Sequence, residues 1–246
     1  SMLQFDGMKL NYDFQDFNLT YCYEPSQREK LIVSAYYGMD NASLLDKQSV
    51  MDIGVRWSNL ATALSYKHIF DDCVWHTDAH FSGFQNRVDV NESIINVNAG
   101  SKLASTGIKS FVNIPFGDKI SLKSGVEWLS YFNEELSFES KGIGLESQHD
   151  ATLNMMHEVS IFADLEQNVT SWFNYSVGLR PSLWKNDKIF YGLSPRITVN
   201  FPINSEHKLK AHYGIYQQAL HKAGLTDGGL PTDYFFLATE QNKPIF

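Results

Sequence analysis

The chain alternates apolar and polar residues over long stretches, which is the pattern of β-strands with two unlike faces. From Trp75 to Gly83 the odd positions are small or apolar, whereas the even positions are polar. Similar alternation recurs along the chain and predicts ten strands, at residues 9–23, 30–38, 50–69, 74–84, 94–114, 119–132, 155–166, 171–183, 188–201 and 207–217. No window has a competing helical pattern. The sequence therefore predicts an all-β protein.

The lengths of these strands and of their connections favour a membrane barrel. Strands such as 50–69 and 94–114 exceed the ~3–10 residues usual in soluble proteins, and a barrel strand needs ~9–11 residues to cross the hydrocarbon. Short turns at 24–29, 71–72, 116–119, 166–168 and 204–207 alternate with long polar segments at 38–49, 85–93 and 133–154 and after 218. Short turns at one end and long loops at the other are typical of outer-membrane barrels. We expect an antiparallel up-and-down meander of about ten long strands, forming part of a transmembrane β-barrel.

Composition narrows the choice of protein class. The 246 residues include 17 Phe, 12 Tyr and 5 Trp, which is far more buriable surface than a disordered chain carries. The mean hydropathy is -0.27 and no run approaches 18 apolar residues, so a transmembrane helix is excluded but a transmembrane barrel is not. A net charge of -8 without a basic run argues against nucleic acid as a partner.

Several short motifs carry a family resemblance through their order along the chain. They are Val55–Asn59, Tyr66–Phe70, Gly178–Pro181, Leu193–Ile197, Lys208–Gly214 with Gln217 and Gln218, Leu230–Phe235 and Asn242–Pro244. In this order they resemble the barrel of TonB-dependent outer-membrane receptors of the Bacteroidetes type. The resemblance implies a twenty-two-stranded barrel closed by an N-terminal plug. It also implies energised uptake of a scarce ligand, such as a siderophore, vitamin, peptide or glycan, across a bacterial outer membrane, without a cofactor.

The chain departs from that family pattern in three respects. It has no Gly-rich plug segment or N-terminal coupling box, it has only about ten strands, and Pro244 interrupts the alternation near its end. We therefore expect residues 1–246 to be a partial barrel, with 218–246 as an extracellular loop region. Its partners would be outer-membrane lipid, a small-molecule ligand of the parent receptor and, only through a missing N-terminal region, the TonB complex.

His76, Asp78 and His80 form a histidine-rich motif on one face of a predicted strand. Two imidazoles and a carboxylate can bind a divalent metal, because alternate residues of a strand point the same way. Same-face neighbours are nevertheless ~6.6 Å apart, so that sharing one ion requires favourable rotamers. We predict a hydrated wall of the lumen at these residues and no metal site.

Three arginines in predicted strands complete the candidate ligand path. Arg180 and Arg196 fall on the polar phase of clear alternations, and Arg56 is placed in the lumen with them. They could line a route for an anionic ligand such as a metal chelate. The alternative is a structural ladder with the carboxylates of neighbouring strands, namely Asp78, Glu127, Glu158 and Asp164.

No motif in the sequence points to catalysis. A nucleophile elbow, a zinc-protease motif, a P-loop and a dinucleotide fingerprint are all missing from the sequence, so we predict neither enzyme activity nor catalytic residues. The alternative to a transporter is a soluble β-sandwich that serves as a binding or adhesion module with recognition loops. The direction of the apolar phase separates the two, because a barrel points it outward and a sandwich buries it.

Overall fold

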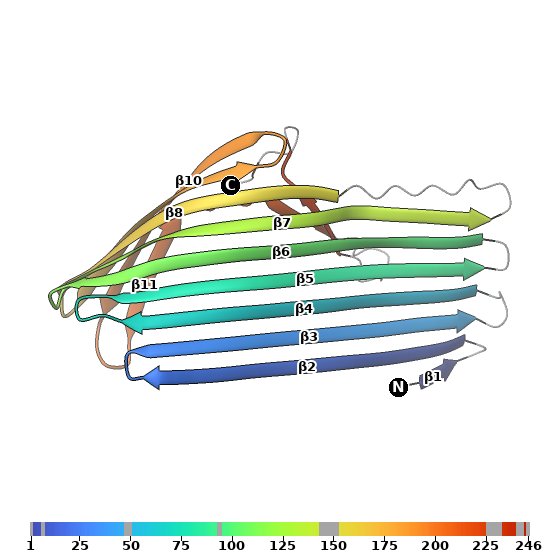
Figure 1. Cartoon of the computed structure of the whole chain (residues 1–246), viewed down its shortest axis with the longest axis horizontal. Helices are drawn as coiled ribbons and strands as arrows, with labels where there is room; N and C mark the ends of the chain where they lie inside the picture. The colour runs from blue at the N-terminus through green and yellow to red at the C-terminus, as the bar shows by residue number, and fades with distance from the viewer. Residues whose placement is uncertain are drawn as a thin grey trace.

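The chain folds into one long antiparallel sheet in sequence order (Figure 1). The computed structural model describes residues 2–5, 8–46, 51–92, 95–142, 153–224, 233–239 and 244. The strands of the sheet are β1 (Met2–Phe5), β2 (Met8–Ser26), β3 (Glu29–Asp46), β4 (Met51–Ile69), β5 (Val74–Glu92), β6 (Ile95–Phe116), β7 (Ile120–Gly142), β8 (Leu153–Thr170), β9 (Phe173–Lys185), β10 (Ile189–Pro202) and β11 (Lys208–Gly214). The ten predicted strands correspond in order to β2–β11, and the predicted all-β antiparallel meander is confirmed.

The predicted long loops are wrong in large part, because strands continue through them. β3 runs on to Asp46, β5 to Glu92 and β7 to Gly142, so most of 38–49 and 85–93 and the start of 133–154 are strand. In these end segments of the strands the alternation of apolar and polar residues fades. The backbone hydrogen bonds of the ladder do not depend on that alternation, so pairing continues where the sequence signal ends.

The sheet curls into an open trough. β2–β7 form a broad, gently curved wall, and β8–β11 fold back behind it (Figure 1). Within the described residues, β1 and β11 lie at the two edges and are not paired with each other. The tight turn between β6 and β7 uses Gly117 at a φ of 66°, a left-handed conformation that glycine adopts without steric cost.

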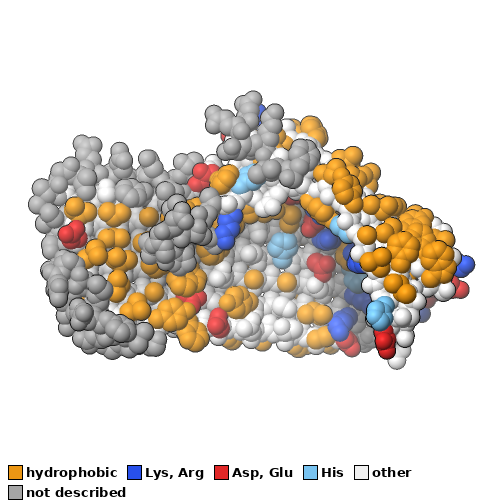
Figure 2. All heavy atoms as spheres, turned by 180° about the vertical axis from the view of Figure 1, so that it is seen from behind, with side chains coloured by type: hydrophobic (Ala, Val, Ile, Leu, Met, Phe, Trp, Pro, Cys, Tyr) orange, Lys and Arg blue, Asp and Glu red, His pale blue; other side chains and the backbone are white. Residues whose placement is uncertain are grey.

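The two faces of the trough differ in chemistry. Apolar side chains of the long strands lie exposed on the convex face, including Phe81, Ile108, Val126, Ile161, Leu179, Leu193 and Tyr213, whereas charged and histidine side chains gather in the hollow (Figure 2). Within the described residues, the one further sheet has two strands. The β-sandwich alternative is therefore wrong, because the apolar phase is not buried between two sheets. No helix in the described part of the chain is long and apolar enough to span a membrane.

The second sheet covers part of the concave face. It is a hairpin of β12 (Leu220–Gly224) and β13 (Asp233–Leu237), and β13 contacts β6, β7 and β8. Its core joins residues of the barrel wall to residues of the hairpin and its flanks, namely Met156, Trp184, Ala219, Leu237 and Ala238. The stretch 218–246 thus includes an inward-folded hairpin in its described part. Its assignment as an extracellular region stays a prediction.

Candidate functional site

An ion network centred on Arg180 lies on the concave wall. Arg180 projects from β9 between carboxylates of β7 and β8: its Nη1 lies 2.9 Å from Glu127 Oε2 and its Nη2 lies 3.1 Å from Glu158 Oε1. The same Nη2 donates to Ser160 Oγ, which in turn donates to Glu158. Both carboxylate side chains are largely buried, at 14% and 11% exposed. Paired charges with additional hydrogen bonds are the form in which buried ions are tolerated.

Arg196 forms a second, separate ion pair on the next strand. Its Nε and Nη2 donate to the two carboxylate oxygens of Asp164, each at 2.8 Å, in a bidentate fork. The pair passes over Gly178 on the intervening strand β9. A Cβ at Gly178 would collide with both Asp164 and Arg196, so glycine at this position leaves the room that the pair occupies.

These arginines form the wall of a cavity of about 450 Å³ under the start of the C-terminal segment. Its lining combines the ion network with hydroxyl and amide groups, from Glu127, Tyr131, Glu158, Arg180, Ser182, Ser194, Arg196, Tyr216, Gln217 and Gln218, and it also includes Leu129, Ala219 and Leu220. Among the lining residues, the charges of the two arginines are balanced by those of the two carboxylates, Glu127 and Glu158. The cavity wall is therefore polar and close to neutral, with hydrogen-bonding groups to offer a bound molecule.

His76, Asp78 and His80 share the concave face of β5 but do not converge on one point. Asp78 accepts a hydrogen bond from Ser65 Oγ at 2.5 Å, and the His76 ring stacks on Phe111 with centroids 4.7 Å apart. Within the described residues, no group of three or more His, Cys, Asp or Glu side chains is placed to hold a metal ion. Each member of the motif has its own surroundings, as in a polar wall.

Arg56 does not belong to this face, and its predicted lumen-facing position is wrong. It is the cross-strand partner of Arg87 on β5. Arg87 is an odd-numbered β5 residue, on the face opposite to His76, Asp78 and His80. The physical reason lies in the halves of β4 and β5 that are farther from the short turns. There the apolar residues, such as the buried Val55 and Val88, face inward, so that the polar residues face outward.

Of the two alternatives for the arginines, the structure shows the ladder for Arg180 and Arg196, each bonded to carboxylates of neighbouring strands. Asp78 takes no part in it. The assignment of a ligand path stays a prediction. Sequence inspection did not place Tyr131 or Gln217 at this cavity and missed the hairpin that covers it. The segment after 217 has no period-two signal, and nothing in the sequence shows that it folds inward onto this wall.

His221 is expected to make docking of the hairpin sensitive to pH. Its side chain is buried beside Phe236, with ring centroids 5.1 Å apart, and burial lowers the pKa of His221 below its ordinary value. A lowered histidine pKa gives stability that is full above the unfolded value of ~6.5 and is lost as the pH falls below it.

We therefore expect backbone hydrogen exchange in β12 and β13 to accelerate between pH 7.5 and 5.5, after correction for intrinsic rates. The variant His221→Gln should remove most of this pH dependence. Equal protection of the hairpin at both pH values in the unmodified chain would contradict the assignment.

Comparisons with known proteins identify the fold. No family model matches the sequence, and no curated protein is significantly similar to it. Solved structures do match, and one of them is the copper transporter OprC, with a TM-score of 0.64 and 11% identity over 86% of this chain and 37% of OprC. The RagAB peptide transporter has a TM-score of 0.64 and 9% identity, over 97% of this chain and 39% of the transporter chain. The alcaligin outer membrane receptor FauA from Bordetella pertussis has a TM-score of 0.60 and 14% identity, over 92% of this chain and 41% of FauA.

These neighbours are TonB-dependent outer-membrane receptors, and the present chain has the fold of part of their barrel wall. The chain spans about two fifths of the length of the receptors that it matches. The TM-scores of 0.60 and 0.64 show a shared fold at identities of 9–14%. They do not extend to ligands or to energy coupling.

Proposed function

We propose that the chain is barrel wall of a TonB-dependent outer-membrane receptor that takes up a scarce ligand into a bacterial cell. The observation that supports it most lies in the half of the sheet nearer the short turns, where the convex face is apolar and exposed and the concave face carries charged and histidine side chains. Apolar residues toward lipid and polar residues toward a lumen are the arrangement of membrane barrels. The solved structures that match the chain share the fold of its sheet.

In this proposal the concave wall guides the ligand and performs no bond chemistry. The cavity beside Arg180 and Arg196 offers paired charges, hydroxyls and amides, and His76, Asp78 and His80 extend the polar surface across β5. A ligand that moves along such a wall exchanges one set of hydrogen bonds for another, which suits passage better than tight binding. Gating by a plug and contact with the TonB complex belong to other parts of such a receptor.

The proposal is tested in cells that carry the natural gene. Membranes separated on a density gradient should contain the chain in the outer-membrane fraction. Uptake of four probes, ferric citrate, cyanocobalamin, an oligopeptide mixture and maltoheptaose, is then compared in the deletion strain and the complemented strain. We expect gene-dependent uptake of one probe that a protonophore abolishes. Recovery of the chain in the soluble fraction, or gene-dependent uptake that survives the protonophore, would contradict the proposal.

A further inference from the structure

The convex face changes from apolar to polar partway along β4 and β5. Going away from the short turns, Leu60 on β4 and Phe81 on β5 are the last large apolar residues that face outward. Arg56 and Arg87 lie beyond them on the same face. The apolar part of β5, from Val74 to Gly83, matches the ~9–11 residues that cross a hydrocarbon layer. The two arginines therefore lie at the level of lipid headgroups if the chain sits in a membrane as proposed above.

Arg56 and Arg87 oppose each other directly across β4 and β5. Like charges in this position destabilise a sheet unless something compensates them. Arg87 pairs with Asp89 at 2.7 Å, whereas Arg56 Nε donates to the neutral Asn41 Oδ1 at 2.6 Å. No carboxylate of the described residues forms an ion pair with Arg56, which leaves a positive charge in excess.

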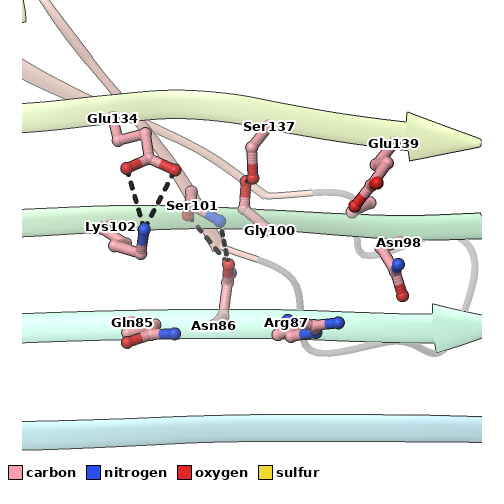
Figure 3. A pocket seen from close by; sticks show the side chains of 11 residues that line it. Gln85, Asn86, Arg87, Asn98, Gly100, Ser101, Lys102, Glu134, Ser137 and Glu139 are labelled. Atoms are coloured by element: carbon pink, nitrogen blue, oxygen red, sulfur yellow. Dashed lines mark hydrogen bonds and ion pairs between the residues drawn. The ribbon is translucent and has the colours of Figure 1, made fainter. Parts of the chain in front are cut away.

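A third cation, Lys102, stands on the same face of β6 beside a small polar pocket (Figure 3). Lys102 Nζ lies 2.9 Å from Glu134 Oε2, and Arg87 lines the same pocket of about 160 Å³. The pocket lies next to the register shift between Gly100 and Lys102. Gly100 lines the same pocket. A larger residue does not fit there, because a Cβ would come within 2.8 Å of a backbone oxygen of β5.

An apolar groove of about 420 Å³ adjoins this polar pocket on the side of the short turns. Pocket and groove share Gln85, Lys102 and Glu134. The groove lies over Gly83 and is lined by Tyr37, Leu60, Phe81, Ala104, Phe132 and Leu153. An apolar groove that ends at cations complements a molecule with an anionic head and a hydrocarbon tail.

We propose that the convex face of β4–β6 carries a docking site for an anionic lipid, with its phosphate at Arg56, Arg87 and Lys102 and an acyl chain in the adjoining groove. The site rests on the proposed membrane location. The charge of the lipid compensates the facing arginines, and its chain covers apolar surface that the described residues leave exposed.

The test measures lipid selectivity of the full chain in phosphatidylcholine bilayers, by electron spin resonance of spin-labelled phosphatidylglycerol and spin-labelled phosphatidylcholine. We expect the bound fraction to favour phosphatidylglycerol. The double variant Arg56→Gln/Arg87→Gln should lower that preference about fivefold or more, since one basic residue near a membrane surface contributes about fivefold. The control Lys208→Gln/Lys210→Gln removes two exposed cations from the concave face of β11 and should leave the preference unchanged.

A second variant tests the groove without altering charge. Gly83→Phe should fill the groove and lower the phosphatidylglycerol preference toward that of the arginine variant. An unchanged preference in either Gly83→Phe or Arg56→Gln/Arg87→Gln overturns the proposal. So does displacement of the labelled lipid by millimolar inorganic phosphate, or a dimer in sedimentation experiments that the arginine variant abolishes. If neither labelled lipid is restricted by the chain, the membrane location itself fails.

Discussion

Replacing Arg180 with leucine is expected to destabilise the folded chain by about 3–5 kcal/mol. The substitution removes the cation that Glu158 pairs with and leaves Glu127 with Lys109, whose Nζ lies 4.0 Å from Glu127 Oε2, and both carboxylates are largely buried. Breaking a buried pair is costly because it leaves charges without compensation, even where the intact pair contributes little net stability. The free energy of unfolding is measured by urea titration in detergent micelles, followed by tryptophan fluorescence.

Arg28→Leu is the matched control, because Arg28 pairs with Asp71 at 2.8 Å on the exposed rim of a short turn. Solvated pairs contribute about 0–1 kcal/mol, so this variant should unfold close to the unmodified chain. The triple variant Arg180→Leu/Glu127→Leu/Glu158→Leu should recover much of the lost stability, because no buried charge then stays unpaired. Equal effects of Arg180→Leu and Arg28→Leu would refute the network as a structural centre.

Trp184→Ala is expected to release the β12–β13 hairpin from the wall. Trp184 is 2% exposed and packs with Met156, Ala219 and Leu237 in the core that joins the hairpin to β8 and β9. Removing a buried tryptophan costs about 3–5 kcal/mol through lost contacts and the cavity left behind. Hydrogen exchange followed by mass spectrometry should show loss of protection in Leu220–Gly224 and Asp233–Leu237, while β5 and β6 stay protected.

Trp172→Ala provides the control for this experiment. Trp172 is 60% exposed beside the turn between β8 and β9, so its removal should leave protection of the hairpin unchanged. A hairpin that stays protected in Trp184→Ala would mean that other contacts hold it, such as the hydrogen bond from Asn133 Nδ2 to the backbone oxygen of Phe235. The hydrophobic core described here would then not explain docking.

The contrast between Arg196 and Arg56 shows how far the sequence predicts the site. Arg196 lies in a strand whose apolar residues are exposed on the convex face, so its polar phase identifies the concave face correctly. Arg56 lies beyond the apolar zone, where Val55 and Val88 turn inward and the rule that polar residues face the lumen no longer applies. The alternation of apolar and polar residues shows which way a side chain points only where one face of the sheet has to be apolar.

The hairpin and the cavity lay beyond sequence reasoning for a different reason. Met156 and Trp184 face inward, on the same side of the sheet as Glu158 and Arg180. The local sequence does not distinguish the part of this face that the hairpin covers from the part that stays uncovered. Their burial depends on contacts with Ala219 and Leu237, which follow much later in the chain. Strand pairing between neighbours is encoded locally by alternation, whereas docking of a distant hairpin is not.

In the proposed barrel the convex face meets lipid and the concave face meets water. Leu193 and Ser194 are adjacent on β10, and they point to opposite faces. Spin labels on Leu193→Cys and Ser194→Cys, in a chain whose free Cys22 and Cys73 are replaced by serine, are measured in lipid bilayers for collisions with oxygen and with a water-soluble nickel complex. We expect oxygen to dominate at 193 and the nickel complex to dominate at 194. Dominance of the nickel complex at both positions, or the reversed pattern, would contradict this expectation.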